Sequence, residues 1–130
     1  HAIREVVGKD VPILFRISLD HRFNGGRDLE YSMKILKELE KEGIDAFDID
    51  AGCYEILDYI FPPAYLGESC MSYVCEDARK VVNVPLINAG THNPESALEL
   101  IESGNVDFVS FGRALIADPM MPKKLIIVKM

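Results

Sequence analysis

The chain has 130 residues, of which 48% are hydrophobic and 8% aromatic, enough for a core in one domain but hardly for two. Fourteen Lys and Arg against 21 Asp and Glu give a formal net charge of −7, which argues against nucleic acid as a partner because such a surface repels phosphodiester backbones. No segment approaches the roughly 18 consecutive apolar residues of a membrane span, and since no signal-peptide pattern is present we expect a cytoplasmic protein.

The first part of the chain predicts a strand, a helix and a second strand. Residues 11–18 are short, apolar and bounded by breakers, as in a buried strand. Asp28 is suited to cap a helix whose apolar residues recur at helical spacing as far as Gly43. Residues 46–50 form the second predicted strand, and a long loop is expected over residues 51–67.

The second part of the chain repeats this order of elements. A helix of roughly residues 69–82 leads to a predicted strand at residues 84–88. Asn93-Pro94-Glu95 then combines an N-cap, a proline at the first helical position and an acid near the positive end of the helix dipole. The helix that starts there is followed by a strand at residues 107–111, and Gly112-Arg113 opens a last short helix.

Strict alternation of strands and helices predicts an α/β fold with a parallel sheet. The unit is duplicated, since residues 10–14 resemble 83–87 and residues 43–47 resemble 104–108. Duplicated units without a G-x-G-x-x-G turn favour a (β/α) barrel over a dinucleotide-binding fold. Four units make half of a TIM (β/α)8 barrel. We therefore expect residues 1–130 to be a single segment of a longer chain, or a half-barrel that associates with a second copy to cover its open edge strands.

Arg16 is the first candidate site residue, because function in such barrels gathers where the strands end. Alternation places it on one face of its strand with Leu14 and Ser18. An arginine in an apolar strand needs an anionic or carbonyl partner, because a buried unpaired guanidinium is costly. Two kinds of partner remain open: a structural ion pair with Asp48 or Asp50 on the neighbouring strand, or a ligand.

Two loops at strand ends have the composition of an anion site. Residues 88–91 (Asn-Ala-Gly-Thr) and 111–113 (Phe-Gly-Arg) each place a glycine between a strand and a helix, where backbone amides can turn toward a ligand. The loops after the seventh and eighth strands of such barrels are a recurrent phosphate site, and Arg113 would add charge-assisted hydrogen bonds. The alternative is that both glycines serve only as turn residues.

The three cysteines, Cys53, Cys70 and Cys75, are an odd number, which favours reduced thiols over a disulfide framework. The spacing of the last two matches no usual zinc pattern and leaves only His92 as a third ligand, so no metal site is expected. His92 also lies beside the proposed anion site, where a cation would help, although a plain loop histidine is the commoner situation.

With these motifs in place, the chain resembles a known family. The resemblance is carried by residues 84–90, 93–95, 104–107 and 12–18, and above all by residues 111–119. These runs are similar to the Old Yellow Enzyme family, in its NADH:flavin oxidoreductase / enoate (2,4-dienoyl-CoA) reductase branch. The resemblance implies the C-terminal half of a TIM (β/α)8 barrel in an FMN-dependent oxidoreductase. Such an enzyme would pass hydride from NAD(P)H through FMN to an activated alkene, with an enoate or enone as substrate.

The resemblance also implies roles for particular residues. Arg16 would contact the N1/O2 edge of the flavin, where negative charge develops on reduction. Gly52 and Tyr54 would lie near the substrate, and no residue of the segment receives a catalytic role. The loops that would hold the FMN phosphate, through backbone amides and the Arg113 side chain, contain Ala89, Gly90, Thr91, Gly112 and Arg113.

Two parts of the family pattern have no counterpart in these residues. The pair of His or His/Asn side chains that binds the substrate carbonyl in the family belongs to the fourth strand and would precede residue 1. The dienoyl reductase branch continues after the eighth strand with a cysteine-rich iron–sulfur segment, whereas residues 125–130 are mostly apolar and contain no cysteine. An iron–sulfur cluster would therefore belong to the full-length family and not to this segment, and we expect the isolated 130 residues to be inactive.

Two other functions remain open from the residues. A different phosphate-binding barrel enzyme, of the aldolase or isomerase type, would need a catalytic Lys or carboxylate at a strand end. Asp48 and Asp50 meet that need weakly, and no Lys lies in a predicted strand. A non-catalytic half-barrel that assembles with itself or with a partner chain would need only its open strand edges.

Overall fold

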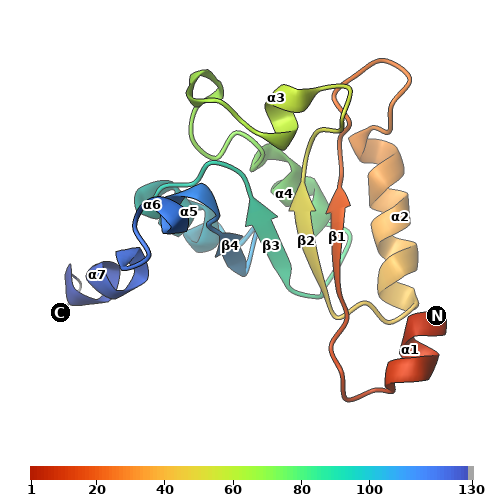
Figure 1. The fold of residues 1–130 in the computed structure, drawn as a ribbon. Helices are drawn as coiled ribbons and strands as arrows, with labels where there is room; N and C mark the ends of the chain where they lie inside the picture. The colour runs from red at the N-terminus through yellow and green to blue at the C-terminus, as the bar shows by residue number, and fades with distance from the viewer. Residues whose placement is uncertain (129–130) are drawn as a thin grey trace.

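The computed structural model describes residues 1–128 and contains one four-stranded parallel sheet (Figure 1). The strands lie in the order β1-β2-β3-β4, and their bounds are β1 Leu14–Ser18, β2 Ala46–Asp50, β3 Leu86–Ala89 and β4 Phe108–Ser110. Each strand therefore pairs with its neighbour in sequence across a helical connection, as in a (β/α) barrel. The predicted α/β class is confirmed, and the open sheet is that of a partial barrel.

The helices begin where the sequence supplies caps. The Asp28 carboxylate accepts a hydrogen bond of 2.8 Å from the Tyr31 amide at the start of α2, and Asn93 forms a capping box with Ser96 at the start of α5. None of the helices in the described residues is long and apolar enough to cross a membrane. The helical segments are α1 Ala2–Val7, α2 Leu29–Lys41, α3 Leu57–Ile60, the 3-10 turn η1 Ala64–Leu66, α4 Tyr73–Arg79, α5 Pro94–Glu102, α6 Arg113–Ala117 and α7 Met121–Val128.

Several boundaries differ from the prediction. β1 begins at Leu14 rather than at residue 11, because Pro12 has no amide hydrogen to give to the ladder. The predicted loop at 51–67 contains α3 and η1, which are too short to leave a periodic pattern in the sequence. The helix predicted from residue 69 begins only at Tyr73. The apolar tail continues α7 as far as Val128, and residues 129–130 lie outside the described part of the chain.

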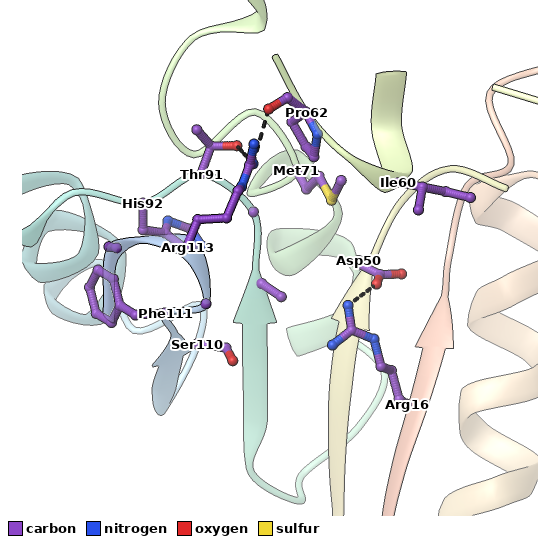
Figure 2. Close-up of a pocket in the computed structure, with 14 residues that line it drawn as sticks. Arg16, Asp50, Ile60, Pro62, Met71, Thr91, His92, Ser110, Phe111 and Arg113 are labelled. Atoms are coloured by element: carbon purple, nitrogen blue, oxygen red, sulfur yellow. Dashed lines mark hydrogen bonds and ion pairs between the residues drawn. The ribbon is translucent and has the colours of Figure 1, made fainter. Parts of the chain in front are cut away.

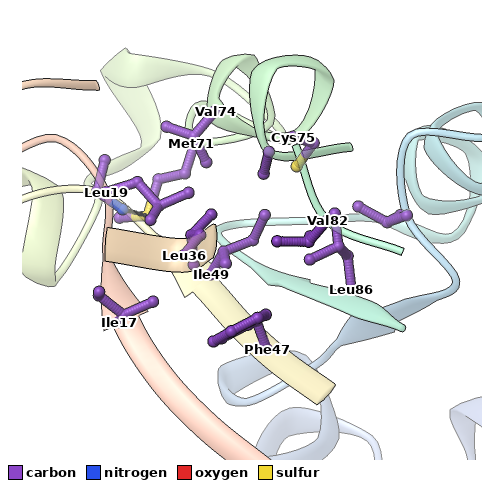
Figure 3. Packing of buried hydrophobic residues seen from close by; sticks show 13 residues of the cluster. Ile17, Leu19, Leu36, Phe47, Ile49, Met71, Val74, Cys75, Val82 and Leu86 are labelled. Carbon is purple, nitrogen blue, oxygen red and sulfur yellow. Dashed lines mark hydrogen bonds between the residues drawn. The ribbon is translucent and has the colours of Figure 1, made fainter. Parts of the chain in front are cut away.

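The hydrophobic core lies between one face of the sheet and the helices α2 and α4 (Figure 3). On the opposite face Leu14 and Phe108 are 59% and 57% exposed. A closed barrel covers that face with side chains from its remaining strands, which the described residues do not contain. Within those residues β1 and β4 also pair on one side only, so both edges of the sheet are open. Core residues labelled in the figure include Ile17, Leu36, Phe47, Ile49, Val74 and Leu86.

The internal repeat has a structural counterpart at the amino ends of the strands. Asp45 and Asp107 occupy equivalent positions before β2 and β4, and each carboxylate bridges to the strand before it. The amides of Ile13 and Leu86 donate hydrogen bonds of 2.6 and 2.8 Å to these carboxylates. An arginine from an upstream helix completes each bridge, Arg4 for Asp45 and Arg79 for Asp107.

Candidate functional site

A cavity of about 470 Å³ opens at the carboxyl ends of the strands (Figure 2). Parallel strands end at the same edge of a sheet, so residues far apart in sequence meet there. Gly52 and Tyr54, expected near the substrate, do not border this cavity in the described structure, and Tyr54 is 84% exposed. All six residues predicted to bind the cofactor do border it: Arg16, Ala89, Gly90, Thr91, Gly112 and Arg113.

Arg16 reaches the cavity from β1 and is paired with two carboxylates of β2. Its Nη1 lies 3.0 Å from Asp48 Oδ2 and its Nη2 lies 2.6 Å from Asp50 Oδ2. The parallel register places Arg16 directly opposite Asp48, with Asp50 one alternation nearer the strand end. Of the two kinds of partner considered for Arg16, the structure therefore contains the ion pair, and it involves both Asp48 and Asp50. Because the Arg16 side chain is still 59% exposed, the pairing leaves it accessible from the cavity.

Asp50 is the acidic side chain of the cavity border and is less exposed than Arg16. Its side chain is 16% exposed, and this burial raises the pKa of the Asp50 carboxyl above its ordinary value, while the charge of Arg16 acts in the opposite direction. Asp48 also pairs with Arg16 but does not border the cavity. The three side chains form one charge cluster on the open face of the sheet.

The loop after β3 has a backbone conformation that few residues adopt. Thr91 has a φ of 46°, in the left-handed region that non-glycine residues rarely occupy. Gly90 has a φ of 150°, and a Cβ at this position would lie 3.1 Å from Met71 Cβ. Glycine is thus favoured at position 90 both by the backbone dihedral angle and by the closeness of Met71, which lies just before α4. Strained backbone of this kind is often found where a chain is shaped around a ligand.

The loop after β4 contains a glycine, Gly112, whose missing side chain is not explained by contact with any described protein atom. Gly112 has a φ of −102°, and a Cβ at this position would meet nothing within 4 Å. Next to it, Arg113 Nη2 donates a hydrogen bond of 3.0 Å to the carbonyl oxygen of Pro62 and lies 3.5 Å from Thr91 Oγ1. The Arg113 side chain therefore bridges the loops that follow β2, β3 and β4.

Backbone amides of both loops are available to a ligand. The N–H groups of Gly90, Thr91, Gly112 and Arg113 donate no hydrogen bond to another atom of residues 1–128. Groups of this kind normally have an acceptor, either in the protein, in water or in a ligand. These four amides and the guanidinium of Arg113 are the kind of hydrogen-bond donors that an anion with several acceptor oxygens requires.

His92 borders the same cavity but does not supply positive charge. It is 7% exposed, its Nδ1 lies 2.8 Å from Ser69 Oγ, and its buried Nε2 has no hydrogen-bond partner in the described residues. Burial lowers the pKa of His92, which keeps the imidazole neutral at neutral pH. Within residues 1–128 no group of three or more His, Cys, Asp or Glu side chains is placed to hold a metal ion.

The wall of the cavity formed by Ile60 and Pro62 was not predicted from the sequence. It belongs to the segment after β2, which folds back over the strand ends. Arg22 holds this segment: its guanidinium lies 4.5 Å from the centre of the Tyr59 ring and donates a hydrogen bond of 2.7 Å to the Tyr59 hydroxyl. No local sequence pattern predicts this wall, because its position depends on contacts between residues nearly 40 positions apart.

Comparison with known proteins identifies a family and several relatives. Residues 1–127 match the NADH:flavin oxidoreductase / NADH oxidase family. The chain is 42% identical over 123 residues to a NADH oxidase of Thermoanaerobacter brockii, 32% identical over 138 residues to a cinnamate reductase of Clostridium sporogenes, and 29% identical over 129 residues to a metal reductase of Desulforamulus reducens. These matches cover 94–95% of this chain but only 18–21% of the relatives, so the chain spans about a fifth of their length.

Proposed function

The chain belongs to the NADH:flavin oxidoreductase / NADH oxidase family, and we propose that it is the segment of a longer enzyme that holds the FMN phosphate. That enzyme would be an ene-reductase, which passes hydride from NAD(P)H to an activated alkene such as an enoate or enone. The family accounts for FMN and NAD(P)H. The cinnamate reductase among the relatives supports an enoate as substrate, since cinnamate carries its alkene next to a carboxylate.

The observation that carries the proposal is that four backbone N–H groups beside the Arg113 side chain, in the loops after β3 and β4, have no acceptor in the described residues. A phosphate monoester offers three acceptor oxygens and up to two negative charges, which matches amides from two loops and one guanidinium. The empty space where a Gly112 side chain would stand allows the phosphate to approach the backbone. In binding it, Arg113 would exchange the weaker neutral acceptors Pro62 and Thr91 for a charged one.

The end of the cavity bordered by Arg16 is suited to the flavin ring of FMN. Strand β1, with Arg16, lies three strand spacings of about 4.8 Å from β4, the strand that leads to Arg113 at the start of α6, so these two strands are roughly 14 Å apart. FMN, when bound, would accept hydride from NAD(P)H and deliver it to the alkene. Arg16 would supply positive charge where negative charge accumulates during that transfer, and Ile60 and Pro62 would keep water from one side of the site.

The two alternative functions are less well supported. Family membership favours flavin chemistry over an aldolase or isomerase acting on a sugar phosphate, and none of the four strands contains a lysine. Self-association of a half-barrel is what the open edges of β1 and β4 predict for the isolated segment. In the longer enzyme we propose that the remaining strands of the barrel cover those edges and the exposed face that carries Leu14 and Phe108.

The test is to purify the complete protein that contains these residues, identify any flavin that it releases, and measure NADH-dependent reduction of cinnamate without oxygen. We expect a yellow protein that releases FMN and shows ping-pong kinetics. Rebinding of FMN by the apoprotein should be much tighter than rebinding of riboflavin, which lacks the phosphate. A colourless protein, or equal affinity for the two flavins, would contradict the phosphate site.

A further inference from the structure

We infer that Asp50 is a positioning residue of the flavin site, which fixes the Arg16 guanidinium at the cavity border and offsets its charge. The Arg16–Asp50 pair, and not Arg16 alone, would then set how strongly the site favours reduced over oxidised cofactor. This inference rests on the proposed function, because it requires that the flavin occupies the cavity that both side chains border.

The positioning role follows from the different exposure of the two partners. Arg16 carries a long side chain that is 59% exposed, and without an acceptor such a side chain would sample many rotamers. Asp50 is short, 16% exposed and fixed in β2, and its Oδ2 lies 2.6 Å from Arg16 Nη2. This bond is the shorter of the two that Arg16 makes to carboxylates, since the contact with Asp48 is 3.0 Å. Figure 2 shows the Arg16 guanidinium held against Asp50 at the end of β2.

The charge effect follows from the count of charges in this cluster. One guanidinium faces two carboxylates, so the cluster of Arg16, Asp48 and Asp50 has a formal charge of −1 when all three groups are ionised. Of the two carboxylates, Asp50 borders the cavity and Asp48 does not. The other charged side chain at the border is Arg113, from α6, which follows β4 at the opposite edge of the sheet from β1. A carboxylate beside Arg16 opposes the accumulation of further negative charge there.

A substitution that keeps the shape and removes the charge separates this role from simple packing. Asp50→Asn retains an oxygen that can accept from Arg16 but no longer offsets its charge. Asp48→Asn is the matched control, because it makes the same chemical change one alternation further from the strand end and away from the cavity. Thermal unfolding of both variants shows whether a difference between them in redox behaviour could come from folding.

The experiment is an anaerobic redox titration of the complete enzyme reconstituted with FMN. Asp50→Asn should favour the reduced cofactor by about tenfold relative to wild type, which for a two-electron couple is a potential about 30 mV more positive. Asp48→Asn should shift the potential by much less. An unchanged potential in Asp50→Asn, or an equal shift in Asp48→Asn, would overturn the inference.

Failure of the proposed function gives a different result. If FMN did not bind at this cavity, no substitution at the phosphate loops would change the affinity of the protein for FMN. Flavin that binds with the expected preference for the phosphate, together with a potential insensitive to Asp50, would leave the proposed function standing and remove only the role of Asp50.

Discussion

Substitution of Gly112 by alanine should separate a phosphate-binding glycine from a turn glycine. The residue has a negative φ, and a Cβ would meet no atom of the described protein within 4 Å. Since Gly112 is also the N-cap of α6, where alanine is less favourable than glycine, the free energy of unfolding of the Gly112→Ala variant should fall by no more than about 1 kcal/mol. A new methyl group in the space where the phosphate is proposed to lie should nevertheless push the ligand away from the backbone.

The size of the effect on binding can be worked out from the amides. Hydrogen bonds to a charged group contribute about 1.5–3 kcal/mol each, and loss of one corresponds to about 10- to 150-fold in the dissociation constant. Gly90→Ala offers a contrast, because its Cβ would lie 3.1 Å from Met71 Cβ at a φ of 150°. That substitution should lower stability by about 1–3 kcal/mol as well as weakening FMN.

The assay is quenching of flavin fluorescence on titration of the apoprotein of the complete enzyme, with FMN and with riboflavin in parallel. Gly112→Ala should weaken FMN by at least about tenfold and leave riboflavin nearly unchanged, since riboflavin has no phosphate for the loop to bind. Thermal unfolding of the same samples provides the control for folding. Wild-type affinity for FMN in a folded Gly112→Ala variant would refute the placement of the phosphate at this loop.

The amide of Ile13, and next Arg4, hold the pKa of Asp45 below its ordinary value, so its contribution to stability is complete above about pH 4 and is lost as the pH falls through the lower folded pKa. Urea unfolding between about pH 2 and 6 should show a difference between wild type and Asp45→Asn that shrinks with acid; a constant difference would contradict this. Asp107→Ala should cost about 1–3 kcal/mol in the same assay, because the Leu86 amide loses its acceptor, whereas Asp118→Ala, at an exposed pair with Lys124, should cost far less. The isolated 130 residues, reconstituted with FMN, should self-associate in sedimentation experiments and should be inactive in enoate reduction, with only slow oxidation of NADH; a monomer that reduces the enoate efficiently would contradict this.

Much of the fold could be predicted from local chemistry. Asp28 and Asn93 marked two helix starts because their side chains cap free amides, and alternation along β1 placed Arg16 on the face that borders the cavity. The glycines of the two loops pointed to the cavity because parallel strands must end at one edge. The short α3 and η1 were missed, since three or four residues leave no periodic signal.

The sequence by itself determined the order of elements, the strand ends and the two glycine loops, because each depends on neighbours within a few residues. Only the tertiary structure decided which partners those residues have. That Arg16 bonds both Asp48 and Asp50 depends on the register between β1 and β2, and that His92 is buried and neutral depends on the packing around it. The cavity wall formed by Ile60 and Pro62 depends on the segment after β2, which folds back over the strand ends. Register and packing are long-range properties, set by how all the strands and helices fit together at once.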